Sequence, residues 1–125
     1  MKLLLDTHVL LWALSSKHDL STLVREALES DSNVIFVSLA SLWELKIKEG
    51  LGKVHLPKNF YSSLEPAGYE LLPIQLGHIE GIGKLPPHHR DPFDRLLIAQ
   101  AKAEQLLLAT RDENIKKYDV NILWA

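Results

Sequence analysis

Two short apolar segments, far apart along the chain, each end in an aspartate beside a threonine. Residues 3–5 are all leucine and precede Asp6, and residues 106–109 precede Thr110 and Asp112. Parallel strands bring their carboxyl ends to one edge of an open sheet, which is where ligands bind. If both segments are strands of such a sheet, two carboxylates about a hundred residues apart meet at one site. The repeated pattern therefore predicts an acidic metal site rather than a purely structural domain.

The spacing of apolar residues is typical of an α/β protein, because strand-like and helix-like periods alternate along the sequence. We expect strands at 2–6, 34–37, 69–74, 106–109 and 120–123. We expect helices at 7–15, after Ser21, at 38–48, after Pro57, between 77 and 89, at 91–105 and at 113–118. A chain of 125 residues can bury roughly two thirds of its unfolded surface. We predict one domain, residues 1–125, with a central parallel β-sheet flanked by helices.

Composition limits the functions that the chain can have. The formal net charge is −2 and the pI is near 6.3, so any RNA contact must come from local basic patches. The absence of cysteine excludes disulfides, thiolate zinc sites and cysteine nucleophiles, and it fits a reducing compartment. The apolar run at the start of the sequence resembles a signal peptide, but Asp6 and His8 interrupt it. No stretch approaches the ~20 apolar residues that span a bilayer. We expect a cytoplasmic protein without membrane contact.

Four aspartates lie at expected helix starts, where capping and metal binding compete as explanations. Asp6 and Asp112 each precede a helix, and an N-cap could account for either residue alone. Asp91 precedes a proline, which is the usual arrangement of a cap followed by proline in the first turn, so we favour capping there. Asp94 continues onto the helix face that should pack on the sheet. We therefore expect Asp94 to point inward, beside the strand ends.

Glu44 lies inside the helix expected at 38–48. At helical spacing it shares one face with three apolar residues, Ala40, Ile47 and Leu51. A carboxylate on an apolar stripe is costly to bury unless it is paired or bound to a metal. The structural alternatives are an ion pair with Lys48 and a local hydrogen bond with Ser41. We favour a functional role, because the polar interruption is in the wrong place for a surface pair.

The four carboxylates Asp6, Glu44, Asp94 and Asp112 should gather at one edge of the sheet. Two carboxylates ~5 Å apart repel each other by roughly 3 kcal/mol at an effective dielectric of about 20. Four of them together need protonation or cations to relieve the repulsion. Oxygen ligands without cysteine select hard cations such as Mg²⁺ or Mn²⁺. Such ions activate water and stabilise charge on a phosphate being cleaved, so we predict a metal-dependent nuclease site, in which Asp91 could replace or supplement Asp94.

Four segments of the sequence resemble the PIN-domain ribonucleases, and in particular the VapC-like toxins of bacterial toxin–antitoxin pairs. The segments are LLDTH at 4–8, SLASLWEL at 38–45, DPFDRLLIAQA at 91–101 and ATRD at 109–112. They occur in the family's order and together span essentially the whole chain. The resemblance implies a parallel-sheet PIN fold and endonucleolytic cleavage of RNA that depends on Mg²⁺ or Mn²⁺.

The resemblance also implies roles for individual residues and partners. The acidic quartet would be Asp6, Glu44, Asp94 and Asp112. The hydroxyls of Thr7, Ser38 and Thr110 would orient carboxylates or coordinated waters. Such toxins form dimers and are silenced by an antitoxin encoded beside them. The residues themselves also predict a homodimer, because the helices at 7–15 and 38–48 carry more Leu and Trp than one sheet face can cover.

Basic residues surround the predicted acidic site. Lys84, His88, His89, Arg90 and Arg95 form one cluster. We expect Arg90, Arg95 and Arg111 to contact RNA phosphates, since an acidic centre needs cationic neighbours to hold a polyanion. The alternative for each is solvated surface charge. Adjacent histidines on a proline-rich loop rarely complete a zinc site, so we do not predict zinc at His88 and His89.

Two other functions fit part of the sequence. A phosphorylated receiver domain has a similar length and a doubly wound sheet, but it needs an aspartate after the middle strand. Here the strand at 34–37 ends in Ser38, and no lysine follows the last expected strand. A catalytically inactive PIN fold could serve as a binding module. The complete set of four acids argues against that alternative.

Overall fold

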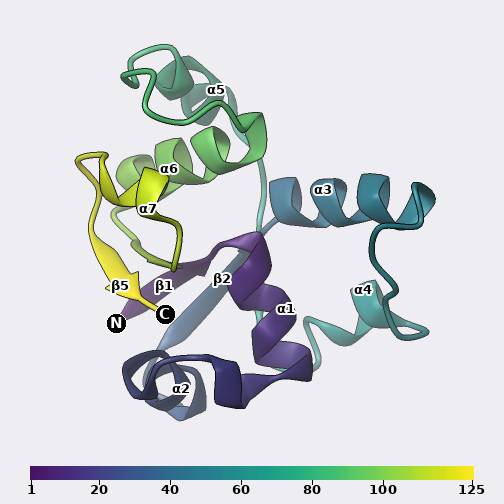
Figure 1. Ribbon diagram of the computed structural model, residues 1–125. Helices are drawn as coiled ribbons and strands as arrows, with labels where there is room; N and C mark the ends of the chain where they lie inside the picture. Colours follow the sequence, from purple (N-terminus) through teal and green to yellow (C-terminus); the bar gives the residue numbers. More distant parts are fainter.

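The computed structural model describes all 125 residues, and its centre is a five-stranded sheet in which all paired strands are parallel. The strands are β1 (Lys2–Leu5), β2 (Val34–Ser38), β3 (Glu70–Leu72), β4 (Leu107–Thr110) and β5 (Ile122–Trp124). Their order in the sheet is β3-β2-β1-β4-β5, so β1 lies in the middle (Figure 1). This arrangement confirms the predicted α/β class and the parallel sheet.

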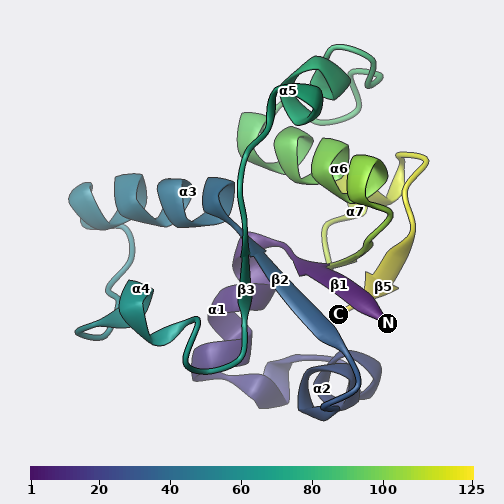
Figure 2. The ribbon, with the colours of Figure 1, turned by 180° about the vertical axis from the view of Figure 1, so that it is seen from behind.

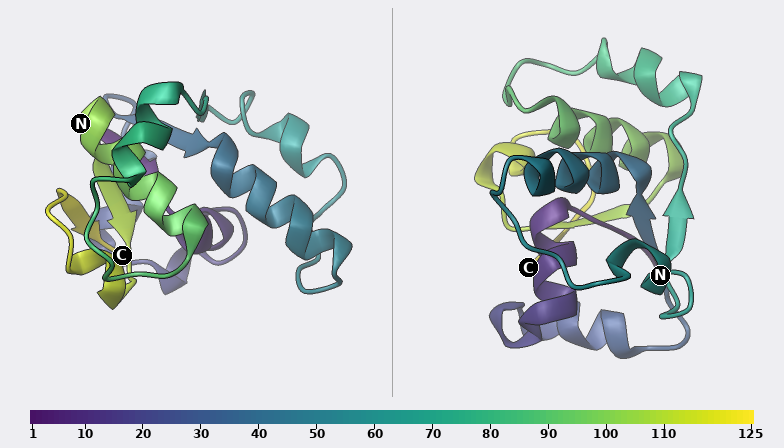
Figure 3. Two further views of the ribbon diagram at one scale, coloured as in Figure 1. Left: turned by 90° about the horizontal axis from the view of Figure 1, so that it is seen from above. Right: turned by 90° about the vertical axis from the view of Figure 1, so that its right-hand side faces the viewer.

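Helices cover both faces of the sheet. They are α1 (Thr7–Ser15), the 3₁₀ turn η1 (Lys17–Asp19), α2 (Thr22–Glu29), α3 (Leu39–Gly50), α4 (Phe60–Ser63), α5 (Leu76–Ile82), α6 (Pro92–Glu104) and α7 (Glu113–Lys116). Helices α1 and α2 lie on one side, and α6, backed by α5, lies on the other (Figures 1 and 2). Figure 3 shows the same layers from two further directions. No helix combines the length and the apolar character needed to cross a membrane.

The alternation of side chains along β1 supplies both hydrophobic cores. Leu3 and Leu5 pack with Val9 of α1 in one cluster, whereas Leu4 packs with Leu97 of α6 in the other. All five side chains are completely buried. A strand that is apolar on both faces is what a sheet covered by helices on both sides requires. The leucine run that opens the sequence is therefore explained by its central position.

The register of β1 and β4 places the carboxyl ends of these two strands side by side. Leu5 pairs with Ala109, and the amide of Asp6 donates to the Ala109 carbonyl at 3.0 Å. The chain runs outward from β1 through β2 and β3, and then crosses β1 to place β4 on its other side. The boundary between β1 and β4 is therefore the topological switch point, where open α/β sheets bind their ligands.

Helix α3 corrects one expectation about packing. Its buried side chains include Ser41, Glu44 and Leu45, whereas Ile47 and Leu51 are 42% and 64% exposed. The predicted apolar stripe through Ile47 and Leu51 is therefore not the buried face. The reason is that α3 projects away from the sheet (Figures 1 and 2), so that its far end has no core to pack against. Glu44 is buried as predicted, but on a neighbouring face.

Candidate active site

Asp6 and Asp112 follow the two adjacent strands β1 and β4 and begin the helices after them. Asp6 Oδ1 accepts from the Val9 amide at 2.8 Å, and Asp112 Oδ1 accepts from the Asn114 amide at 2.8 Å. Both residues are therefore N-caps, as the structural explanation required. One oxygen suffices for each cap, and the second oxygens make other contacts within the site: Asp6 Oδ2 with Thr110 and Asp112 Oδ2 with His89. Capping fixes these carboxylates at the sheet edge and does not exclude a functional role.

The environment of Asp6 disfavours its charge. Burial raises the pKa of Asp6 above its usual value, although hydrogen bonds from Thr110 and Val9 act in the opposite direction. Thr110 Oγ1 donates to Asp6 Oδ2 at 2.5 Å, and it also accepts from the Asp112 amide at 3.0 Å. Thr110 thus links the two strand-end aspartates through its hydroxyl.

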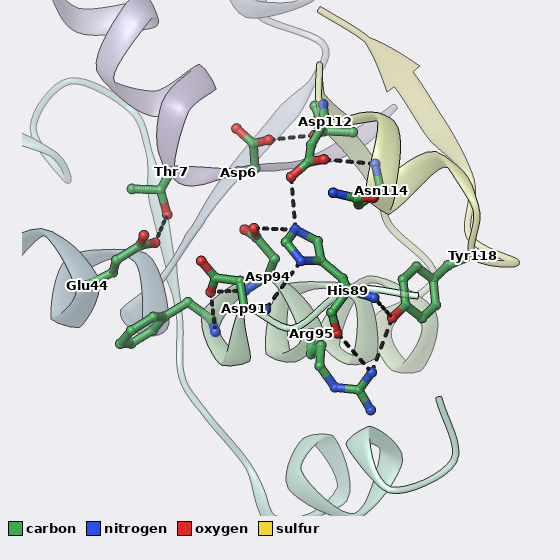
Figure 4. A network of polar contacts seen from close by, with 12 residues as sticks. Asp6, Thr7, Glu44, His89, Asp91, Asp94, Arg95, Asp112, Asn114 and Tyr118 are labelled. Carbon is green, nitrogen blue, oxygen red and sulfur yellow. Dashed lines mark hydrogen bonds and ion pairs between the residues drawn. The ribbon is translucent and has the colours of Figure 1, made fainter. Parts of the chain in front are cut away.

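The sequence predicted that Asp91 caps a helix and that Asp94 points inward, and the structure places both residues in this way. Asp91 Oδ1 accepts from the Phe93 amide at 2.8 Å and from the Asp94 amide at 3.2 Å, so Asp91 is the N-cap of α6. Asp94 points toward the ends of β1 and β4 (Figure 4). Burial, with smaller contributions from the charges of Asp91, Asp6 and Glu44, raises the pKa of Asp94 to about 7. The charged form of Asp94 is therefore disfavoured mainly because the carboxylate is poorly solvated, and the neighbouring acids add to this effect.

Glu44 enters the site from α3. Thr7 Oγ1 donates to Glu44 Oε1 at 2.7 Å, and Lys48 Nζ lies 2.9 Å from Glu44 Oε2. The ion pair with Lys48 therefore forms, but the carboxylate is buried rather than at the surface. Thr7 is therefore in direct contact with this carboxylate, and its orienting role stays a prediction. Ser38 does not contact an acid: its hydroxyl donates to Gln100 Oε1 at 2.6 Å and accepts from the amide of Ala40.

His89 is a residue of the site that the sequence interpretation missed. Its Nε2 lies 2.9 Å from Asp94 Oδ2 and 2.9 Å from Asp112 Oδ2 (Figure 4). These three atoms lie within 4.8 Å of one another, whereas Asp6 and Glu44 stand outside this tight group. In the sequence, His89 lies two residues before Asp91, the cap of α6, and this position could have placed it near the acids. The sequence analysis assigned it only to a basic cluster.

The three arginines predicted to bind RNA have different environments. Arg90 is exposed. The guanidinium of Arg95 faces the preceding loop: it donates to the carbonyls of Ile82, Leu85, Pro86 and His89 and to the Tyr118 hydroxyl. Arg111 donates to the carbonyls of Asp19 and Ala125 and lies over the ring of Trp12, with 4.7 Å from its Cζ to the ring centroid. This geometry favours Arg90 as a phosphate ligand and a structural role for Arg95.

We expect Arg95→Ala to lower the free energy of unfolding by ~1–3 kcal/mol, because the loop carbonyls lose a charged donor. Arg90→Ala should leave thermal stability unchanged and reduce the salt dependence of RNA affinity by about one phosphate contact. Thermal melting and RNA binding at several salt concentrations measure both effects. A flatter salt dependence in Arg95→Ala, without loss of stability, would restore the original assignment of Arg95 to phosphate binding.

A small cleft opens beside the acids. It has a volume of about 240 Å³ and is lined by Asp6, His8, Trp12, Arg111 and Asp112. The cleft therefore joins two of the predicted metal-binding carboxylates to a histidine, an indole and a guanidinium. A polyanion in this cleft would meet a cationic group on the rim and carboxylates at the centre.

Comparison with known protein families identifies the family of the chain. A model of the PIN domain family matches residues 3–121. The chain therefore belongs to the PIN domain family. No curated protein sequence matches it.

Three solved structures illustrate the shared fold. A chain from VapBC2 of Rickettsia felis, bound to a promoter DNA fragment, aligns with a TM-score of 0.75 at 21% identity over 100% of this chain and 99% of that one. A chain from DNA-bound VapBC of Salmonella typhimurium gives 0.73 at 18% identity over 99% and 98%. A chain from a toxin–antitoxin complex of Klebsiella pneumoniae gives 0.64 at 18% identity over 96% and 94%. At these identities the likeness is one of fold, and it extends over the full length.

Proposed function

We propose that this protein is a Mg²⁺- or Mn²⁺-dependent endoribonuclease, the toxin of a toxin–antitoxin pair. The observation that carries the proposal is the gathering of four carboxylates at the switch point of the sheet: Asp6 and Asp112 at the starts of α1 and α7, Glu44 in α3 and Asp94 in α6. Burial, together with the charges of the neighbouring acids, raises the pKa of Asp94 to about 7. Membership of the PIN domain family supports a nuclease, and the similar VapBC structures support a toxin.

The donor set fits a hard divalent cation. Asp94, Asp112 and Asp6 offer carboxylate oxygens, with Glu44 close enough to contribute to the charge felt by Asp94. No cysteine competes for a softer metal. Asp6, Glu44, Asp94 and Asp112 would hold the cation. When bound, it would supply an activated water and charge stabilisation at the phosphate.

The chain's own residues would prepare the site for RNA. Thr110 and Thr7 would hold the carboxylates of Asp6 and Glu44 in fixed directions through their hydrogen bonds. Arg90 would bind a phosphate at the exposed rim. Its guanidinium has no intramolecular hydrogen-bonding partner, whereas that of Arg95 is bound to loop carbonyls.

The test of the proposal is cleavage of single-stranded or loop RNA by chelated protein with and without added cation. We expect no cleavage in excess chelator and restored cleavage with Mg²⁺ or Mn²⁺. Protein carrying Asp6→Asn is the matched control, since a contaminating nuclease would cleave equally in both samples. Cleavage that persists in chelator would contradict the metal dependence. A wild type that binds RNA but never cleaves it would support the inactive binding module instead.

We further propose two protein partners, a second copy of the chain and an antitoxin. An exposed apolar stripe runs along α3 through Leu39, Trp43 and Ile47 and continues to Leu51, the residue that follows the helix. Contiguous exposed apolar surface of this kind marks an interaction site. The VapBC and toxin–antitoxin structures that share the fold are complexes, which supports partners of this kind.

We expect light scattering at micromolar concentration to give twice the mass of one chain, 14.2 kDa. Ile47→Lys should shift the protein toward the single-chain mass, because it places a charge in the apolar stripe. Lys53→Ala, which changes an exposed residue outside the stripe, is the control. A single-chain mass for the wild type would refute the homodimer.

A further inference from the structure

The imidazole of His89 occupies the space between two of the predicted metal-binding carboxylates (Figure 4). Its Nε2 is 2.9 Å from an oxygen of Asp94 and 2.9 Å from an oxygen of Asp112. A cation shared by the same two carboxylates would need the same space. The proposed function gives His89 no role, and its position raises the question whether it binds the cation or competes with it.

The hydrogen bond at the second ring nitrogen, Nδ1, indicates that His89 competes with the cation. His89 Nδ1 accepts a hydrogen bond from the amide of Asp91 at 3.2 Å. A neutral imidazole carries one proton, so when Nδ1 accepts, the proton is on Nε2 and points at the carboxylates of Asp94 and Asp112. Metal-binding histidines have the opposite arrangement, in which one nitrogen offers its lone pair to the metal and the other donates to a carboxylate, carbonyl or water. If the ring proton moved to Nδ1, this proton and the Asp91 amide proton would point at each other, and the hydrogen bond between the two nitrogens would be lost.

The backbone of His89 is held in place, so the ring is the part that can move. The His89 amide donates to the Tyr118 hydroxyl at 2.8 Å, and the Tyr118 hydroxyl also accepts from Arg95 at 3.1 Å. The side chain has only the Asp91 amide and the two carboxylates as hydrogen-bonding partners. Rotation of the ring toward solvent would free the two carboxylates and break the hydrogen bond from the Asp91 amide, while the His89 amide keeps its bond to Tyr118.

We propose that His89 is a positioning residue that takes the place of the cation in the metal-free protein. It bridges Asp94 and Asp112 through its Nε2 proton, and it leaves this position when the divalent cation binds. The inference rests on the proposed function, because that function places a cation between these carboxylates. The His89 ring and the cation therefore compete for Asp94 and Asp112. The contacts between His89 and these two carboxylates are lost when the cation binds.

The test is a calorimetric titration of chelator-treated protein with Mn²⁺, for the wild type and for His89→Ala. We expect His89→Ala to bind Mn²⁺ about 10-fold more tightly, since metal binding no longer displaces a hydrogen bond to charged groups. Without metal the variant should melt at a lower temperature than the wild type, and Mn²⁺ should raise its melting temperature by more. His88→Ala is the matched control, because His88 packs against the Tyr118 ring rather than on an acid. It should bind Mn²⁺ as the wild type does.

Weaker binding by His89→Ala would identify His89 as a metal ligand, and equal binding would make it a bystander; either result overturns the inference. If the wild type itself binds no Mn²⁺, the proposed function falls as well, which separates the two failures. Nitrogen NMR of the wild-type imidazoles gives a test that needs no variant. We expect Nε2 of His89 to keep its proton when Mg²⁺ is added, and loss of that proton on metal addition would overturn the inference.

Discussion

Replacing Asp94 with asparagine should reduce RNA cleavage by at least ~100-fold, because the loss of a ligand should cost no less than the loss of a residue that merely orients one. The same change should leave the free energy of unfolding at neutral pH unchanged or raise it. Asparagine keeps the shape of the side chain but removes a charge that its neighbours Asp91, Asp6 and Glu44 repel. Cleavage assays in saturating Mn²⁺ and thermal melting in chelator measure the two effects.

Asp91→Asn is the matched control, three residues earlier on the same helix. Asp91 caps α6 through two backbone amides, so its substitution should cost stability, up to ~1 kcal/mol, and leave substantial cleavage. The two variants should therefore show opposite balances of activity and stability. An inactive, fully stable Asp91→Asn beside an active Asp94→Asn would exchange the roles of the two carboxylates.

Metal-free protein should lose stability as the pH rises from about 4 to about 8. Between these values folded Asp94 keeps a proton that the unfolded chain releases, because the pKa of Asp94 is raised from 3.8 to about 7. Unfolding then releases a proton, so a higher pH favours the unfolded state. The contribution of Asp94 is fully present below pH ~4 and is lost as the pH passes ~7, by at most ~4 kcal/mol. Burial raises the pKa of Asp6 as well, which acts in the same direction.

Denaturant unfolding at several pH values, in chelator, measures this loss. Asp94→Asn should show a smaller decrease, because asparagine does not titrate in this range, and the difference between the two proteins isolates Asp94 from other groups. Saturating Mn²⁺ should restore stability at the upper end of the range. If the wild type and Asp94→Asn have the same dependence on pH, the raised pKa of Asp94 is refuted.

The sheet and its acidic edge could be predicted from the sequence because local signals determine both. The short apolar runs around Leu4 and Leu108 favour strands buried on two faces, and the carboxyl ends of parallel strands lie along one edge of the sheet. The cap at Asp91 was equally local, since an aspartate before a proline carries its own signature. The roles of the four acids stay predictions, although the structure brings Asp94 and Asp112 together and places Asp6 and Glu44 beside them.

The features that the sequence did not reveal depend on contacts between distant segments. The buried face of α3 is decided by how far the helix extends beyond the sheet, which no periodicity within residues 38–48 encodes. The partners of Arg95 belong to a loop whose path depends on the packing of α5 on α6. His89 reaches Asp112 only because α6 and α7 begin at neighbouring points of the sheet. In each case the sequence gives the residue type, but the residue that it contacts depends on the tertiary structure.

The order of the strands also affects when the site can form during synthesis. The proposed ligands come from residues 6, 44, 94 and 112, and the middle strand of the sheet is the first one made, whereas its neighbour β4 is among the last. Until β4 has emerged and docked beside β1, Asp112 cannot approach Asp6, so a nascent chain lacks an assembled centre. Such late, long-range pairing slows folding relative to local contacts. If the protein is the proposed toxin, this topology delays its action on RNA until nearly the whole domain has left the ribosome.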